Sequence, residues 1–287
     1  MAMEFPVSSY YYARKREKEP SDRDIRDEFL KEKIMEVWDS GKGRKVYGAR
    51  KIWLELNARG IEVARFTVER LMRSLGIRGA GNTRKRPPTT KPGDPADRPA
   101  DLLDRCFSAG APNRRWVADI TYVPARSGWV YTAFIMDLFS RRIVGWQVAD
   151  NLRAGLALDA LEMAIFARRD EDLGGLVHHS DRGVQYTAIR YAERLAEERA
   201  VRSVGSKGDS FDNAAAEALN SLYKRELIDP RNDWQNVDDV MLATMDWVQW
   251  YNEERIHSYS GDMPPKKFEE TYYEMLESGK LTSSSQM

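Results

Sequence analysis

Three strand patterns follow one another without a helix between residues 115 and 149. The side chains of the first, WVADITYVP, alternate between an apolar face and a face that carries Asp119 and Thr121. The second, WVYTAFIMDLF, is apolar almost throughout, as in a central strand, and the third is IVGWQVA. Short polar turns separate the three patterns, which therefore predict an antiparallel meander.

Helical and strand patterns alternate after the meander. We predict helices at residues 156–169, 188–198, 210–227 and 234–252, with short strands at LVHHSD and VRSVG. The succession of three strands, helix, strand, helix, strand and helix indicates an α/β fold, a mixed sheet flanked by helices. The sequence after Tyr273 is polar, and we expect a disordered tail there.

The predicted helix at residues 210–227 carries a polar stripe. Its alanines favour a helix, and Asp212 can cap it. Four polar residues fall on one side at helical spacing: Asn213, Glu217, Asn220 and Lys224. The leucines and Tyr223 fall mostly on the other side and can face a core. One interpretation is a solvated surface with a glutamate and a lysine too far apart to pair, and the other is a functional carboxylate.

A short all-α domain precedes the sheet. Residues 21–78 contain an amphipathic helix that could be broken near Lys31, then two helical patterns, YGARKIWLELNARG and VARFTVERLMRSLG. Two short helices joined by a glycine-containing turn fit a helix-turn-helix. Arg65, Arg70 and Arg73 on or near the second helix would contact DNA. The alternative is a three-helix bundle that only packs against the rest of the chain.

The charge distribution favours DNA contact by this front domain. The formal net charge is zero, but between Gly41 and Lys91 there are 14 Lys and Arg against 3 Asp and Glu. A basic front and an acidic rear indicate that the front faces nucleic acid. Residues 79–100 hold five of the twelve prolines, which indicates an extended linker. Within it, three basic residues either follow a phosphate backbone or stay solvated: Arg84, Lys85 and Arg86.

Composition limits the remaining classes of protein. The single cysteine, Cys106, excludes an intramolecular disulfide framework and a cysteine-based zinc site. There is no apolar run of about 18 residues and no signal-peptide pattern, so we expect no membrane contact and a cytoplasmic, nucleoid-associated protein. We divide the chain into five parts: an extension at 1–20, a helix-turn-helix domain at 21–78, a linker at 79–105, a catalytic core at 106–228, and a C-terminal helical extension and polar tail at 229–287.

Three carboxylates stand out from the other acidic residues. Asp119 lies in the middle of the first strand, where a charge is costly unless it is paired or binds a metal. Asp181 ends the fourth strand, and functional side chains gather at such strand ends in α/β sheets. Glu217 projects from the helix at residues 210–227, with 35 residues between it and Asp181.

Other candidate ligands have simpler interpretations. Asp137 is predicted to make an ion pair or a turn, and Asp209 and Asp212 are predicted to cap a helix. The adjacent histidines His178 and His179 are predicted to pack or to contact DNA. His257 is predicted to fix local structure.

Five motifs resemble the OrfB-type transposases of bacterial insertion sequences. They are WVADITYV, DLFSRRIVGW, HHSDRGVQY, DNAAAEALNSLYKREL and YNEERIH, and the helical segment YGARKIWLEL also looks like the front of these proteins. The resemblance covers about residues 8–268. It implies a ribonuclease-H-like catalytic fold shared with retroviral integrases, with an Asp-Asp-Glu metal site at Asp119, Asp181 and Glu217.

The implied chemistry explains why carboxylates are needed. Cleavage of a phosphodiester adds charge to an anionic centre, and two divalent ions about 3.5–4 Å apart can activate the attacking oxygen and stabilise the leaving one. Mg²⁺ prefers hard oxygen ligands, and Mn²⁺ is expected to substitute for it. Asp119 would bridge the two ions, with Asp181 and Glu217 each completing one. Lys224 could hold a DNA phosphate as a point charge.

The resemblance also implies a reaction and partners. The enzyme would cut the 3′ ends of the insertion sequence and use the freed 3′-hydroxyl to attack another phosphodiester, first at the other end and later in target DNA. We expect double-stranded DNA as partner, a homo-oligomer on DNA, and fusion to or pairing with an upstream-frame helix-turn-helix protein. The alternatives are a DNA-binding regulator that does not cut, or a ribonuclease-H-type nuclease.

Overall fold

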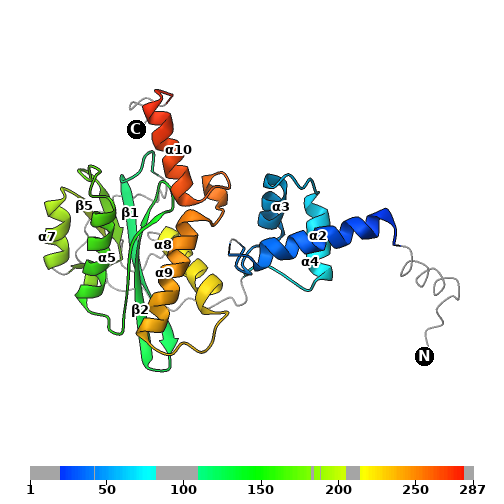
Figure 1. The fold of residues 1–287 in the computed structure, drawn as a ribbon. Helices are drawn as coiled ribbons and strands as arrows, with labels where there is room; N and C mark the ends of the chain where they lie inside the picture. The colour runs from blue at the N-terminus through cyan, green and yellow to red at the C-terminus, as the bar shows by residue number, and fades with distance from the viewer. Residues whose placement is uncertain are drawn as a thin grey trace. The chain divides into compact units, whose positions relative to one another are not determined.

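The computed structural model describes residues 20–41, 43–81, 109–181, 184–187, 189–204 and 214–280. The chain forms two compact units, residues 1–81 and residues 82–287 (Figure 1). Cys106, the basic residues Arg84, Lys85 and Arg86, and the capping candidates Asp209 and Asp212 lie outside the described residues. Among the described residues, no helix has both the length and the apolar character needed to span a membrane.

The first unit consists of three helices, α2 (Asp22–Asp39), α3 (Ala49–Ala58) and α4 (Arg65–Ser74). Ser21 and Asp24 form a capping box at the start of α2. The helix then continues unbroken past Lys31, so the predicted alternative of a break there is wrong. A continuous buried stripe explains this, because Leu30, Ile34 and Val37 recur at helical spacing.

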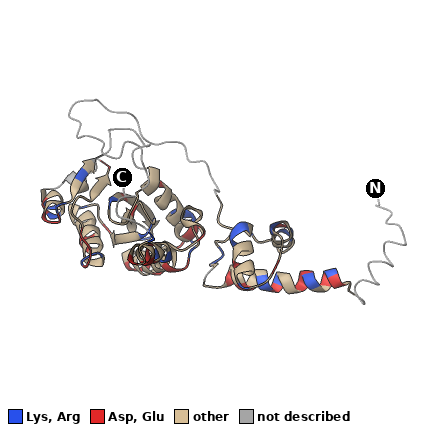
Figure 2. Cartoon of the chain, turned by 90° about the horizontal axis from the view of Figure 1, so that it is seen from above, with Lys and Arg blue, Asp and Glu red and all other residues tan. Residues whose placement is uncertain are grey.

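Charge is unevenly shared among these helices. Acidic and basic residues alternate along α2, the long helix next to the N-terminal trace in Figure 2. Helix α4 has no acidic residue in its first turn and carries Arg73 in its last. The α3–α4 pair, joined by a turn in which Gly60 has a φ of 78°, is the predicted helix-turn-helix.

The second unit is built on a five-stranded sheet in the order β3-β2-β1-β4-β5. Strands β1 (Arg115–Ala125), β2 (Gly128–Asp137) and β3 (Ile143–Ala149) form the predicted antiparallel meander. Strands β4 (Val177–Ser180) and β5 (Val201–Val204) run parallel to β1. Because β4 pairs with β1 only from Arg115 to Ala118, the rest of β1 has no described strand on that side.

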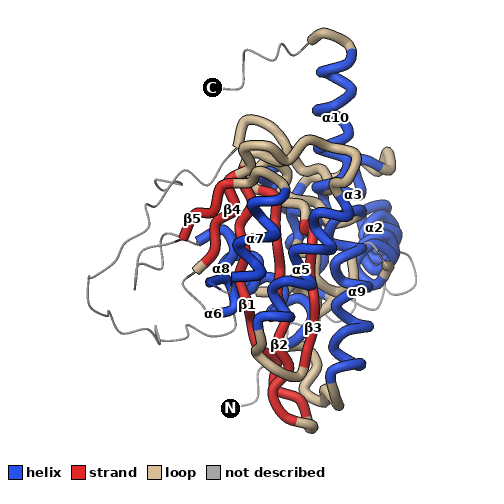
Figure 3. Tube along the Cα trace, turned by 90° about the vertical axis from the view of Figure 1, so that its left-hand side faces the viewer, coloured by secondary structure: helices blue, strands red, loops and turns tan. Residues whose placement is uncertain are grey.

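Helices cover both faces of the sheet (Figures 1 and 3). On one face lie α5 (Ala154–Ala167), α6 (Val184–Thr187) and α7 (Ile189–Glu197). Their apolar side chains form one core with Trp116, Ala118 and Ile135 of the sheet. Helix α5 approaches β3 closely, since a side-chain carbon on Gly145 would lie 2.1 Å from the Ala160 carbonyl oxygen.

The other face is covered by α8 (Ala214–Tyr223) and α9 (Val237–Glu253). Rings from β2, α8 and α9 meet here, with the centroids of Phe134 and Tyr223 5.0 Å apart and those of Tyr223 and Trp247 5.2 Å apart. The Tyr223 hydroxyl bonds to Thr244 at 2.7 Å. These contacts anchor α8 on the sheet.

The C-terminal part contains elements that the sequence patterns did not predict. Helix α8 continues as a π-helical turn, η1 (Lys224–Ile228), and a 3-10 turn, η2 (Ser258–Ser260), precedes α10 (Pro265–Glu277). The expected disorder after Tyr273 is therefore wrong as far as Glu277. Helix α10 is held by an ion pair and by ring contacts, because buried Glu269 pairs with buried Arg168 at 2.6 Å and the rings of Phe268 and Tyr272 pack against Phe139.

Candidate active site

Asp119 lies on β1 with both carboxylate oxygens hydrogen-bonded. The backbone N–H of Ile120 donates to Oδ1 at 2.9 Å, and the side-chain amide of Asn220 donates to Oδ2 at 2.8 Å. Asn220 belongs to α8, so this bond ties the helix to the strand at the carboxylate. Such bonds stabilise the ionised form and fix its orientation.

Strand register places Asp181 beside Asp119. Ala118 pairs with Ser180 across the parallel β1–β4 ladder, Asp119 is the next residue on β1, and Asp181 directly follows the end of β4. Adjacent strands lie about 4.8 Å apart. The two carboxylates therefore lie side by side where the ladder ends, and Asp181 is exposed.

The third acid, Glu217, lies in the first turn of α8 and is exposed. It precedes Asn220 by three residues, so the two share one side of the helix. Partial burial raises the pKa of Glu217. The Glu217 charge also acts on Asp119, which indicates that all three acids belong to one electrostatic cluster.

The surroundings of Asp119 make ionisation of its carboxyl group unfavourable. Burial, followed by the negative charge of Asp181, raises the pKa of Asp119 to about 7, and the charge of Glu217 adds to this. The hydrogen bonds from Ile120 and Asn220 oppose the shift. Both carboxylate neighbours thus disfavour ionisation of Asp119, the situation that a bound cation relieves.

The three acids fit a divalent metal ion by their chemistry. They supply hard oxygen donors in a negatively charged cluster, which suits Mg²⁺ or Mn²⁺. In the described part of the chain no three acidic, histidine or cysteine residues lie close enough to hold an ion as they stand. Asp181 and Glu217 are exposed, so their side chains have room to turn towards Asp119.

Asn220 is a site residue that sequence reasoning did not assign. Sequence analysis placed it on the polar stripe without a role, yet it is buried and bonded to Asp119. Its amide oxygen is buried with no partner among the described residues. The available signal was its position three residues after Glu217, on the same side of the helix.

Lys224 lies at the end of the same stripe. Its ammonium nitrogen is 4.4 Å from the centroid of the Tyr122 ring. Tyr122 follows Asp119 by three residues on β1, so Lys224 lies along the strand from the carboxylates, and not over them.

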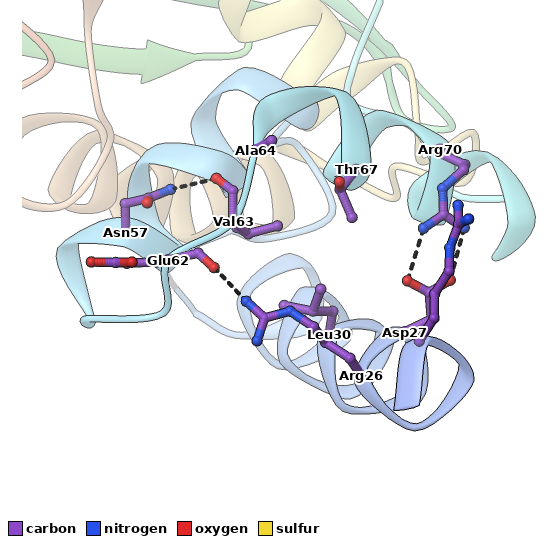
Figure 4. A pocket seen from close by; sticks show the side chains of 10 residues that line it. Arg26, Asp27, Leu30, Asn57, Glu62, Val63, Ala64, Thr67 and Arg70 are labelled. Carbon is purple, nitrogen blue, oxygen red and sulfur yellow. Dashed lines mark hydrogen bonds and ion pairs between the residues drawn. The ribbon is translucent and has the colours of Figure 1, made fainter. Parts of the chain in front are cut away.

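In the helical unit, the three predicted DNA-contacting arginines have different surroundings. Arg65 pairs with Glu69 within α4, and Arg73 is exposed. Arg70 donates two hydrogen bonds, 2.9 and 2.8 Å, to Asp27 of α2. Figure 4 shows this pair at one end of an open cleft of about 790 Å³ between α2 and the α3–α4 turn.

The remaining polar candidates are structural. Asp137 is buried and accepts bonds from the backbone N–H of Asn113 and of Phe139, which confirms its predicted turn role. The rings of His178 and His179 are buried and bond to Tyr191 and Ser203, as expected for packing. His257 is buried beside Arg255 and Tyr251, in agreement with a local structural role.

Family models match most of each unit. An integrase core domain matches residues 109–210, a further integrase core domain model matches residues 201–265, and an HTH-like domain matches residues 24–86. Together with the sheet topology, these matches define an integrase-type, ribonuclease-H-like core joined to a helix-turn-helix unit. Enzymes with this core depend on a divalent metal.

Curated relatives identify the family. A protein of insertion sequence element IS986/IS6110 from Mycobacterium tuberculosis is 50% identical over 93% of this chain and 96% of its own length. The transposase of IS629 from Shigella sonnei is 44% identical over 93% of this chain and 88% of its own length. The transposase of IS904 from Lactococcus lactis is 34% identical over 87% of this chain and 97% of its own length. The chain belongs to the bacterial insertion-sequence transposases, and it is an enzyme of the Asp-Asp-Glu type.

The chain also shows some similarity to a solved structure. The HTLV-2 integrase catalytic core domain in complex with magnesium aligns with a TM-score of 0.44 and 16% identity, over 56% of this chain and 99% of that chain. The predicted family and the predicted α/β ribonuclease-H-like fold with a helical front unit are confirmed by the family models and the sheet topology.

Proposed function

We propose that Asp119, Asp181 and Glu217 are the catalytic triad of this transposase and hold two Mg²⁺ ions. The observation that carries the proposal is the register between β1 and β4, which brings Asp119 and Asp181 out side by side. Bound divalent ions supply charge stabilisation to the attacking and leaving oxygens of a phosphodiester.

The protein groups have distinct parts in this proposal. Asp119, held at both oxygens, is the fixed ligand from which the site is built. Asp181 and Glu217 approach it from β4 and α8 as exposed side chains that can close on the ions. The reaction is hydrolysis at the 3′ end of the insertion sequence, after which the freed 3′-hydroxyl attacks a second phosphodiester.

Duplex DNA is the proposed partner of both units. The helical unit would bind the terminal inverted repeats with Arg65 and Arg73 on the phosphates, while Arg70 stays paired with Asp27. Lys224 would contact a phosphate near the cut. The enzyme would act as a homo-oligomer on DNA, fused to or paired with an upstream-frame helix-turn-helix protein.

One experiment tests the reaction. The full chain is incubated with labelled duplex DNA that ends in the inverted repeat of its insertion sequence, in Mg²⁺, Mn²⁺, Ca²⁺ or a chelator. We expect 3′-end nicking and strand transfer in Mg²⁺ and Mn²⁺, binding without strand transfer in Ca²⁺, and neither reaction in the chelator. Cleavage in the chelator would contradict the metal site. Binding without cutting in Mg²⁺ would indicate a regulator, and cleavage confined to RNA–DNA hybrids would indicate a ribonuclease.

A further inference from the structure

Two exposed aromatic rings lie on the β1–β2 hairpin next to the carboxylates. Tyr122 is 52% exposed and Trp129 is 54% exposed. Their ring centroids are 5.2 Å apart at an interplanar angle of 88°, and the ammonium of Lys224 lies over the Tyr122 ring. These three residues, Tyr122, Trp129 and Lys224, are called the Tyr122 patch below.

The Tyr122 patch lies further along β1 from the proposed active site, but on the opposite face of the strand, because Tyr122 and Asp119 are three residues apart and strand side chains alternate. Lys224 of the helix that contacts Asp119 still reaches the Tyr122 ring, at the edge of β1 that β4 leaves unpaired beyond Ala118. Helix α8 and strand β1 run the same way here, because Asn220 reaches Asp119 and Lys224 reaches Tyr122. Three residues of strand span about 10 Å. Seven residues of helix, from Glu217 to Lys224, also span about 10 Å. Since nucleotides on one strand are about 3.4 Å apart, the patch lies two to three nucleotides from a phosphate held at the carboxylates.

A role limited to hairpin stability does not account for the whole arrangement. A cross-strand aromatic pair does stabilise a hairpin. However, about half of each ring still faces water, and no acidic residue occurs from Ile120 to Met136. Open ring faces beside a lysine, on a hairpin without negative charge, suit a ligand that is both planar and anionic. A nucleotide has both properties.

We propose that the Tyr122 patch binds an unpaired nucleotide of the DNA substrate two or three positions from the cut. Its base stacks on the exposed ring faces, and its phosphate contacts Lys224. The base must be unpaired because a base inside a duplex offers no free face to a side chain. This inference rests on the proposed function, since the carboxylates define where the DNA is cut.

The test uses the full chain in Ca²⁺ with two labelled probes. One is a blunt duplex ending in the inverted repeat, and the other carries three unpaired nucleotides at that end, with 2-aminopurine as the last base. Stacking on an aromatic ring quenches 2-aminopurine fluorescence. We expect quenching with the parent protein and a preference for the extended probe, and both should be lost in a Tyr122→Ala, Trp129→Ala double variant. The preference should fall by roughly 5- to 150-fold, the value of one stacked base.

Two further variants separate stacking from general damage. A Tyr122→Phe, Trp129→Phe double variant keeps both rings and should retain quenching and preference. Phe166→Ala removes a 67% exposed ring on α5 that also has a cation over it, Arg169 at 4.6 Å, and should change neither signal. If the alanine double variant binds and quenches like the parent, the proposal is wrong.

The same probes distinguish failure of the patch from failure of the proposed function. A parent protein that cuts duplex DNA in Mg²⁺ but neither quenches 2-aminopurine nor prefers the extended probe would overturn the patch and leave the catalytic proposal intact. A parent protein that quenches, loses quenching in the alanine double variant, and yet does not cut would support nucleotide binding by the patch and contradict the catalytic proposal.

Discussion

The side-chain amide of Asn220 donates a hydrogen bond to Oδ2 of Asp119 across 2.8 Å, and so joins α8 to the central strand at the proposed metal site. The backbone N–H of Ile120 holds the other oxygen. Asp119 is thus oriented by a partner on a second element before any metal binds. This is the arrangement by which outer residues fix metal ligands in other proteins.

Replacing Asn220 by alanine should therefore weaken metal use without preventing folding. We expect Asn220→Ala to raise the Mg²⁺ concentration for half-maximal cleavage by about 10- to 100-fold, the usual effect of losing such a partner. Cleavage is measured in a Mg²⁺ titration, with Ser221→Ala, a change at the neighbouring exposed residue, as control. An unchanged Mg²⁺ dependence would assign Asn220 to packing alone.

The three carboxylates should each be essential for cutting and dispensable for binding. Asp119→Asn, Asp181→Asn and Glu217→Gln keep the side-chain shape but remove the negative charge that a metal needs. We expect cleavage to fall by more than about 100-fold in each, beyond the effect of losing an outer partner. DNA affinity in Ca²⁺ should change little. Asp170→Asn, at an 86% exposed side chain, serves as the matched control. A variant that cuts at the parent rate would remove its residue from the triad.

The raised pKa of Asp119 predicts how the stability of the metal-free protein varies with pH. The folded pKa is about 7 against an ordinary value of 3.8, so between these values the folded protein holds a proton that the unfolded chain releases. This contribution to the free energy of unfolding therefore falls as pH rises through that window.

Removing the charge of Asp119 should prevent this loss of stability at high pH. In a chelator, Asp119→Asn should be more stable than the parent at pH 8, and this advantage should shrink on the order of 2 kcal/mol by pH 5. Asn220 can accommodate the new amide, because its own amide oxygen has no partner among the described residues. Denaturant unfolding at both pH values measures the difference. Added Mg²⁺ should stabilise the parent at pH 8 and not the variant, and an equal advantage at both pH values would contradict the pKa assignment.

The sequence was sufficient to predict most of the sheet and the position of two acids. Strand alternation and the short polar turns predicted the β1–β2–β3 meander, which the structure confirms. Asp119 stood out because a charge in the middle of a strand is unfavourable unless it is paired. Asp181 stood out because functional side chains gather at strand ends. Their adjacency followed only from the parallel pairing of β1 with β4, a contact between segments about 60 residues apart.

Other features depend on contacts that local patterns do not reveal. The helical pattern shows only that Asn220 is polar and lies on the stripe, and its role follows from its hydrogen bond to Asp119, 101 residues earlier. Helix α10 buries few apolar residues and is held by Glu269 against Arg168 and Arg142, which lie 101 and 127 residues earlier in the chain. Arg70 is basic and on the expected helix, but its partner Asp27 lies 43 residues earlier in the chain.

The surroundings of the α4 arginines predict different effects on DNA binding. Arg73 is exposed, and Arg65 makes only a surface pair with Glu69, so both can turn to phosphates. Arg70 is held by two bonds to Asp27, whose side chain is 18% exposed. The hydrogen bond from Arg70 lowers the pKa of Asp27, as expected for a formed ion pair.

Salt titration of DNA binding should separate these arginines. Each phosphate contact contributes about −0.9 to the slope of log affinity against log salt concentration, so an Arg65→Ala, Arg73→Ala double variant of the full chain should flatten the slope by about 2. Arg70→Ala should leave the slope nearly unchanged and instead destabilise the helical unit by about 1 kcal/mol. Residues 1–105 alone should show the same salt dependence as the full chain, while residues 106–287 should bind weakly. If Arg70→Ala flattens the slope as much as one of the other two changes, its pair with Asp27 opens on DNA and all three arginines contact phosphate. If none of the three changes alters the slope, the helical unit serves assembly and the basic linker or the core binds the DNA.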